Sequence, residues 1–216
     1  MSLKDTLEKI QEEILKKDEI RQEIQNIVRK TTRLSKQAIF LAHKDRIEDA
    51  ENLLKEASGN LSKLDEISKT YPDLYYSGLV NSAFEEYAEA NLFLKIISEG
   101  KFVGPREIGV PSESYVLGLA DVIGELRRRS LDLIRKGNVR DAEKCLEIME
   151  TIYAEIISRD DLLILISGLR RKCDIARRII EATRGDVTVE IRRSMLNNAM
   201  KDLQKILESM LSSEGT

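Results

Sequence analysis

Histidine is almost absent from this chain, since His43 is the only one among 216 residues. A Ser-His-Asp triad or a Cys-His dyad would have no other imidazole as its base, and no glycine elbow stands beside a nucleophilic serine or cysteine. The two cysteines, Cys145 and Cys173, lack metal-ligand spacing, so zinc sites built on His and Cys are excluded by number. We expect His43 at the surface or at a helix end, and both thiols to be buried in a protein of a reducing compartment.

Long apolar runs are also missing. The run LLILIS is among the longest, far short of the roughly 18 residues of a membrane span, and the start MSLKDTLEKI has no apolar signal core. We therefore expect a cytoplasmic protein with no membrane partner. The 42% of hydrophobic and 34% of charged residues are typical of a globular protein. The net charge of -3 gives no general reason to expect a nucleic-acid partner.

Proline and glycine are sparse, and apolar residues recur every three or four positions, which is the helical period. We predict an all-α bundle of seven helices, without strands, forming a single domain over residues 1–216. The expected helices are Leu3 to His43, Arg46 to Ser68, Asp73 to Ser98, Ser112 or Ser114 to Lys136, Asn138 to Ser158, Asp160 to Thr183, and Asp186 or Thr188 to Leu211.

Local signals mark several helix ends. Asp45 and Asp73 are expected to cap the second and third helices, and Asn138 to cap the fifth after a left-handed Gly137. Gly185 is expected to end the sixth helix. The segment between Gly100 and the fourth helix should be irregular, and the tail 213–216 disordered.

A local concentration of basic residues lies on the expected first helix. Arg29, Arg33 and Lys36 follow a four-then-three step along one face, with Lys30 beside them, and the segment RKTTRLSK holds no acid. Such a face can bind a phosphate backbone. A solvated helix face is the alternative, and the spacing alone favours it.

Acidic pairs mark the expected third and fourth helices. Glu86 and Glu89 are three residues apart, and Asp121 and Glu125 are four apart, so each pair lies on one side of its helix. Apolar residues flank Asp121, and a buried carboxylate is costly unless it meets a cation or hydrogen-bond donors. Four such groups on two facing helices suggest an oxygen-ligand site for a hard divalent cation.

Ion pairing is the alternative explanation for these four acids. Arg127, Arg128 or another basic side chain could neutralise them in buried ion pairs.

Four segments resemble the translin family, in its translin-associated factor X (TRAX) branch. The run YVLGLADVIGELRR from Tyr115 to Arg128 resembles the family's signature helix, and FEEYAEA from Phe84 to Ala90 is similar to its third-helix motif. RLSKQAIFLAHK from Arg33 to Lys44 resembles the basic first helix, and the run through Thr183-Arg-Gly185 is similar to the usual end. The likeness covers about residues 20 to 185.

The acids decide which branch the resemblance implies. TRAX-type chains keep both glutamates of the third helix with the Asp and Glu of the fourth, and form a magnesium-dependent endoribonuclease. Translin-type chains usually lose part of this set and bind nucleic acid without cutting it. This chain keeps Glu86, Glu89, Asp121 and Glu125. The resemblance therefore implies that these four are catalytic residues and ligands of Mg²⁺, with Mn²⁺ as an alternative ion.

Partners and assembly follow from the same resemblance. It implies binding of RNA, with single-stranded DNA as a second candidate, through Arg29, Lys30, Arg33 and Lys36. Family members form hollow, typically octameric barrels, so we expect a homo-oligomer with an octamer favoured. The helix from Val187 to Leu211 lies beyond the family's usual end, so residues 186–212 are expected to form an extra helix.

Two other functions stay open. One is a non-catalytic, translin-like oligomer that binds RNA or single-stranded DNA. The other is a purely structural helical protein in which the acids are ion-paired and the basic face is solvated.

Overall fold

The computed structural model describes residues 2–71 and 78–213, and within these ranges the chain is helical with no strand. The prediction of an all-α fold is confirmed. The eight helices of the described ranges are α1 (Leu3–His43), α2 (Ile47–Thr70), α4 (Gly78–Glu99), α5 (Pro105–Ile108), α6 (Ser112–Arg135), α7 (Val139–Ile157), α8 (Asp160–Leu165) and α9 (Leu169–Ser213). None of the described helices is long and apolar enough to cross a membrane. The predicted cap at Asp73 lies outside the described residues, as do 214–216 of the predicted disordered tail.

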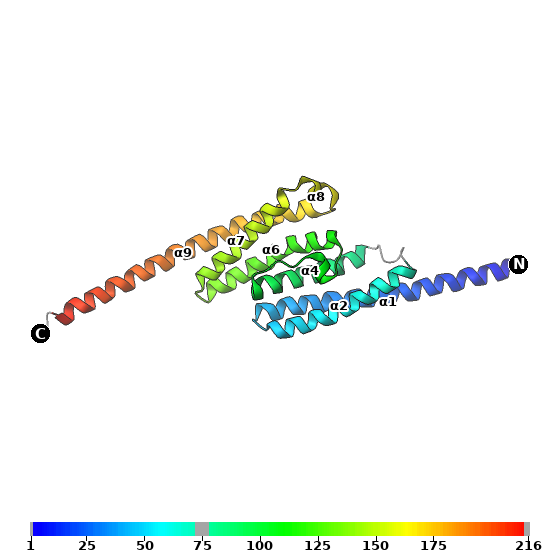
Figure 1. Ribbon diagram of the computed structural model, residues 1–216, viewed down its shortest axis with the longest axis horizontal. Coiled ribbons are helices and arrows are strands. Elements are labelled where there is room, and N and C mark those ends of the chain that lie inside the picture. The colour runs from blue at the N-terminus through cyan, green and yellow to red at the C-terminus, as the bar shows by residue number, and fades with distance from the viewer. Residues whose placement is uncertain (1, 72–77, 214–216) are drawn as a thin grey trace. The chain divides into compact units, whose positions relative to one another are not determined.

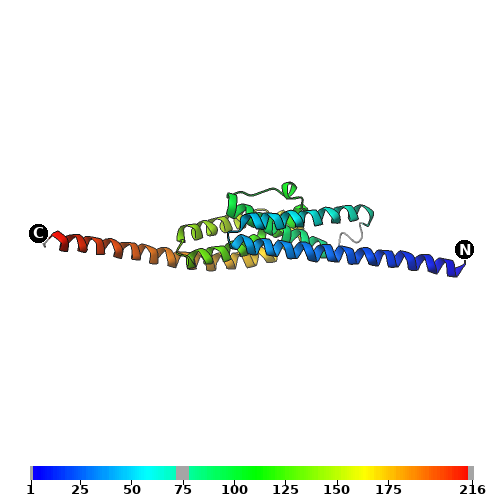
Figure 2. The same ribbon diagram turned by 90° about the horizontal axis from the view of Figure 1, so that it is seen from below.

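Contacts divide the chain into two compact units, Met1–Val122 and Ile123–Thr216. The boundary falls inside helix α6, not at a linker, and the prediction of a single domain over 1–216 stays a prediction. In the first unit, α1 packs along both α2 and α4 (Figures 1 and 2). In the second, α7 packs along α9, and the short α8 contacts both.

Helix α1 uses one continuous face to pack in the first unit. Its buried residues on this face step by four and three positions, which is the spacing of a packed helix seam. They are Ile24, Val28, Thr31, Ser35, Ala38 and Ala42. The start of α1 extends beyond α2 (Figure 1), and before Ile20 nearly all of its side chains are exposed. The same seam continues there with exposed apolar residues such as Leu7 and Ile10.

His43 is the last residue of α1, as predicted, but it does not lie at the surface. Its side chain is buried, and its ring centroid lies 4.7 Å from that of Phe93 of α4. The prediction of buried thiols is confirmed for Cys145 and Cys173.

The predicted cap of the second helix is wrong. Asp45 has a left-handed backbone, with φ of 59°, and the N-cap position is taken by Arg46, whose side chain makes no capping hydrogen bond. The turn between α1 and α2 is so short that its tight backbone bend takes precedence over the capping preference of aspartate. By contrast, Asn138 does cap α7, accepting a hydrogen bond from the Asp141 amide after a left-handed Gly137.

The segment after Gly100 is less irregular than predicted. It contains the single turn α5, which has Pro105 at its first position and ends at Gly109, where φ is 67°. Proline is pre-organised for a first helical turn and glycine tolerates the left-handed end, so these two residues delimit the turn.

The predicted helix end at Gly185 is wrong, because α9 runs without a break from Leu169 to Ser213. The break comes earlier, at Gly168, where φ is 84°. Residues 187–211 therefore continue α9 and do not form a separate helix.

Tertiary packing explains the continuity through Gly185. Thr183 and Val187 on either side of it are fully buried, and Arg184 contacts Glu150 of α7 at 2.7 Å. Glycine in a helix interior costs only about 1 kcal/mol. Two buried side chains and an ion pair outweigh that cost.

Candidate nucleic-acid interface and acidic site

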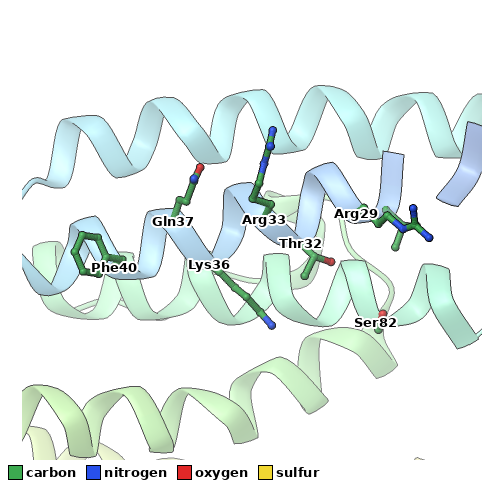
Figure 3. A pocket seen from close by; sticks show the side chains of 8 residues that line it. Arg29, Thr32, Arg33, Lys36, Gln37, Phe40 and Ser82 are labelled. Carbon is green, nitrogen blue, oxygen red and sulfur yellow. The ribbon is translucent and has the colours of Figure 1, made fainter. Parts of the chain in front are cut away.

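The predicted basic face of α1 lines a pocket. This cavity of about 630 Å³ is open to solvent, and Figure 3 shows its side chains along one stretch of α1, with Ser82 contributed by α4. The lining residues are Val28, Arg29, Thr32, Arg33, Lys36, Gln37, Phe40 and Ser82. Three of the four predicted nucleic-acid-binding residues are thus brought together.

Lys30 is the exception. It does not line the pocket, and its Nζ atom lies 2.8 Å from a carboxylate oxygen of Glu56 on α2. The neighbouring Lys30 ammonium lowers the pKa of the Glu56 carboxyl. Lys30 therefore pairs with α2 and lies outside the pocket that the other three cations line.

An ion pair joins the basic face to the acidic pair of α4. Lys36 Nζ lies 3.1 Å from Glu86 Oε1, and the Glu86 side chain is only 27% exposed. The contact shows that the expected phosphate-binding residues and the expected metal-binding residues are neighbours on α1 and α4. Lys36 is the side chain that links the two sets.

Helices α4 and α6 approach closely at Gly118. A Cβ atom at this position would lie 2.7 Å from the Glu85 carbonyl oxygen and 2.9 Å from the Glu89 amide nitrogen. Only glycine allows this approach without a shift of backbone atoms. It places the turn of α6 that includes Asp121 against the turn of α4 that contains Glu89.

Three of the four predicted metal ligands lie where α4 and α6 approach each other, and their side chains are partly buried. Glu86, Glu89 and Asp121 are all half-buried. Among the described residues, however, no group of three or more His, Cys, Asp or Glu side chains is arranged to hold a metal ion. The metal assignment therefore stays a prediction.

The fourth predicted ligand, Glu125, lies one turn beyond Asp121 on α6 and belongs to the second unit. Its carboxylate is 3.7 Å from the Arg128 guanidinium, as the ion-pair alternative expects. Arg127 instead contacts Asp186 at 3.3 Å and donates a hydrogen bond to Thr183 at 2.7 Å, both on α9. Arg127 thus supports the second unit.

Sequence reasoning missed the uncharged part of the pocket. Gln37 and Thr32 continue the face of Arg33, and Phe40 lies one turn after Lys36 with half of its side chain exposed. The four-three-four step from 29 to 33, 36 and 40 could have identified Phe40 as a member of this face. Ser82 could not have been found, because only the packing of α4 on α1 brings it there.

Gly118 gives a stability prediction with a matched control on the same helix. Replacing Gly118 by Ala should destabilise the protein by about 1–3 kcal/mol, because backbone atoms of α4 must move to admit the methyl group. Gly124→Ala is the control, since nothing lies within 4 Å of its added Cβ. There the better helix propensity of alanine should add about 0.5–1 kcal/mol of stability. Urea unfolding of both variants measures the difference, and equal effects would mean that the close approach is absent.

Comparison with known proteins gives consistent results. The model of the translin family matches residues 19–183. An uncharacterized protein of Methanocaldococcus jannaschii is 34% identical over 190 residues, which cover 87% of this chain and 84% of that protein.

Solved structures are similar over much of their length. A chain of AfC3PO, in a structure described as a complex with duplex RNA, matches with a TM-score of 0.77 and 32% identity, covering 88% of this chain and 98% of its own. A chain of apo-NeC3PO matches with a TM-score of 0.76 and 26% identity, covering 88% of this chain and all of its own. With a family match over most of its residues and a relative that is 34% identical, this chain belongs to the translin family.

Proposed function

We propose that this protein is a Mg²⁺-dependent endoribonuclease of the TRAX-like branch that acts on short or single-stranded RNA. The observation that supports this most directly is the 3.1 Å contact between Lys36 and Glu86. A phosphate held by Lys36 would lie beside the half-buried acids of α4. The similarity to an AfC3PO chain described in complex with duplex RNA supports RNA as the ligand.

The pocket on α1 supplies the RNA contacts in this proposal. Arg29, Arg33 and Lys36 bind backbone phosphates, which gives affinity that depends on salt and little on sequence. Phe40 presents an exposed aromatic ring in the same pocket, with Lys44 Nζ 5.7 Å from its centroid. Aromatic rings beside cations are typical of surfaces on which bases stack. We therefore place Phe40 in the RNA-binding set, and single-stranded DNA is a second ligand of the same chemistry.

The donor set suits magnesium by its chemistry. Mg²⁺ prefers carboxylate oxygens, keeps several waters, and is usually bound through one or two carboxylates together with substrate phosphates. A three-carboxylate cluster within the free chain is therefore not required. Glu86, Glu89 and Asp121 would hold the ion, with Glu125 as a further ligand or an outer hydrogen-bond acceptor, and Mn²⁺ could substitute. When bound, the ion would supply an activated water and would neutralise charge that develops on the leaving oxygen.

Lys36 has a specific role in this arrangement. Because it is paired with Glu86 in the free chain, a phosphate that binds Lys36 competes with that carboxylate. Glu86 is then released from the ion pair at the moment when substrate is present. RNA binding and the freeing of a metal-binding carboxylate are thus coupled through one side chain.

We also propose that the chain assembles as a homo-oligomer, with an octamer favoured, because family members form such barrels. Light scattering of the purified protein measures the number of subunits.

Cleavage of a short, end-labelled, single-stranded RNA by purified protein tests the function. We expect cleavage with Mg²⁺, none with EDTA, and recovery when Mg²⁺ is restored. Cleavage that persists in EDTA would exclude the metal mechanism.

A second candidate function is a translin-like carrier that binds RNA without cutting it. It is favoured by one observation, that no three acidic side chains are arranged for a metal ion among the described residues. Binding without Mg²⁺-dependent cleavage in the same assay would establish the carrier. No binding at moderate salt would instead point to a purely structural helical protein.

A further inference from the structure

The last part of α9 exposes a regular apolar surface. Beyond Val187, Met195 and Ile206 are exposed, and beside them five apolar residues step by four and three positions, each of them more than half exposed. We call this set the α9 stripe; its members are Leu196, Met200, Leu203, Leu207 and Met210. Val189, one heptad before Leu196, is also exposed and extends the same spacing. A repeat of 3.5 residues sustained over three heptads is the pattern of a coiled-coil seam.

The α9 stripe does not continue the face that α9 uses in its own unit. The buried residues of the first half are Leu169, Cys173, Ala176, Ile180, Thr183 and Val187. At about 100° per residue, the α9 stripe lies about 180° around the helix axis from Val187. Ile191 still follows Val187 on the packing face, but the positions after it on that face are polar, including Ser194, Asn198, Lys201 and Lys205. The stripe therefore points away from the side on which α7 packs.

This segment (Figures 1 and 2) also lies outside the part of the chain that the translin model matches, which ends at residue 183. Contiguous exposed apolar surface of this kind marks an interaction site. The segment 188–213 has four basic and three acidic residues, so its charge is nearly balanced. A helix that binds an anionic membrane or a phosphate backbone would have an excess of basic residues. A balanced helix with a coiled-coil seam fits another helix of the same kind.

We propose that the α9 stripe packs against the α9 stripe of a second copy of this chain, in an antiparallel pair. In a parallel pair in register, Arg193, which takes a seam position, would face its own copy. The antiparallel arrangement instead places Met200 against Leu203 of the second copy, and Leu196 against Leu207. Arg193 then lies beside Met210, near the end of the seam, where its charged head can reach water.

The pairing gives the assembly an isologous contact, in which both copies use the same surface. It rests on the proposed oligomeric state, but not on nuclease activity or RNA binding. It also gives a role to the part of α9 that lies beyond the family match.

A charge placed in the seam tests the contact. Leu203→Glu should reduce the number of subunits in the full-length assembly at least twofold, measured by light scattering without RNA. Asn198→Glu is the matched control, because it adds the same charge to the same helix on the opposite face and should retain the parental mass. Circular dichroism of both variants checks that helix content is unchanged.

The measured masses distinguish a failure of the proposed α9 contact from the absence of any oligomer. A parental chain with the mass of one subunit would overturn both the proposed oligomer and this contact. An oligomeric parent whose mass is unchanged by Leu203→Glu would overturn the contact alone.

Cysteine pairing tests the direction of the two helices. Mixed Leu196→Cys and Leu207→Cys chains should form a disulfide between the two variants, and each variant alone should not. Self-pairing of each variant would mean a parallel pair, and a disulfide between Leu203→Cys and Leu7→Cys would make the start of α1 the partner. Either result would overturn the proposal. The native thiols should not interfere, because Cys145 and Cys173 are buried, and burial raises the pKa of Cys145 to about 11.

Discussion

Replacing Asp121 by Asn is expected to slow Mg²⁺-dependent RNA cleavage by about 10²- to 10³-fold, while RNA binding stays the same or becomes slightly tighter. The substitution removes the charge of one proposed ligand and keeps its shape. Binding should not suffer, because one less carboxylate repels the phosphates. Asp121 is half-buried on the turn of α6 that Gly118 brings against α4, so the amide should be accommodated without repacking.

Asp132→Asn is the matched control for this experiment. It makes the same chemical change on the same helix, at a carboxylate that pairs with Arg135 at 3.0 Å and has no proposed role in the metal site. Single-turnover cleavage and a binding titration should be run on both variants. A parental cleavage rate for Asp121→Asn would show that the metal assignment is wrong. An equal loss of cleavage rate in Asp121→Asn and Asp132→Asn would show that removing any negative charge from α6 slows the reaction.

Replacing Arg33 and Lys36 together by Ala is expected to weaken RNA binding about ten- to thirtyfold at 0.1 M salt. Each lost phosphate contact removes roughly 0.7 from the slope of log K against log salt for a single strand, so the slope should flatten by about one to two units. Both side chains line the same pocket on α1, so one bound strand can contact both.

Lys16→Ala with Lys17→Ala is the matched control, because it removes the same charge from the exposed start of α1. It should change the slope by much less. A slope that stays parental in the Arg33 and Lys36 variant would place the nucleic-acid surface elsewhere. Adding Glu86→Gln to the Lys36→Ala change separates lost phosphate contact from the repulsion of an unpaired Glu86.

Local sequence signals were sufficient for most of the helices. The absence of Pro and Gly between Leu3 and His43 predicted α1 with both ends, and Gly137 with Asn138 predicted the turn into α7. These features depend on the backbone conformations and capping groups of neighbouring residues, so the chain encodes them locally. The segments that resemble the translin family could also be identified from the sequence, because each is a continuous stretch of chain within a helix.

The failures occurred where packing between distant residues outweighed a local preference. Gly185 has the signal of a helix end, but the burial of Thr183 and Val187 and the contact of Arg184 with Glu150 keep α9 continuous. Asp45 has the chemistry of a cap, but it lies in a left-handed turn. A local rule cannot decide whether a helix-end or capping preference is stronger than burial and ion pairing. The outcome depends on which distant residues the fold brings close.

The sequence by itself determined the helical architecture, the basic row on α1 and the four acids for which we propose a metal-binding role. Only the tertiary structure decided that Lys36 contacts Glu86, that Ser82 joins the pocket, and that Gly118 seats α6 on the α4 backbone. It also paired Lys30 with Glu56 and left it outside the pocket that the other three cations line. The physical reason is that spacing along a helix fixes which residues share a face. What that face meets depends on residues far away in the chain.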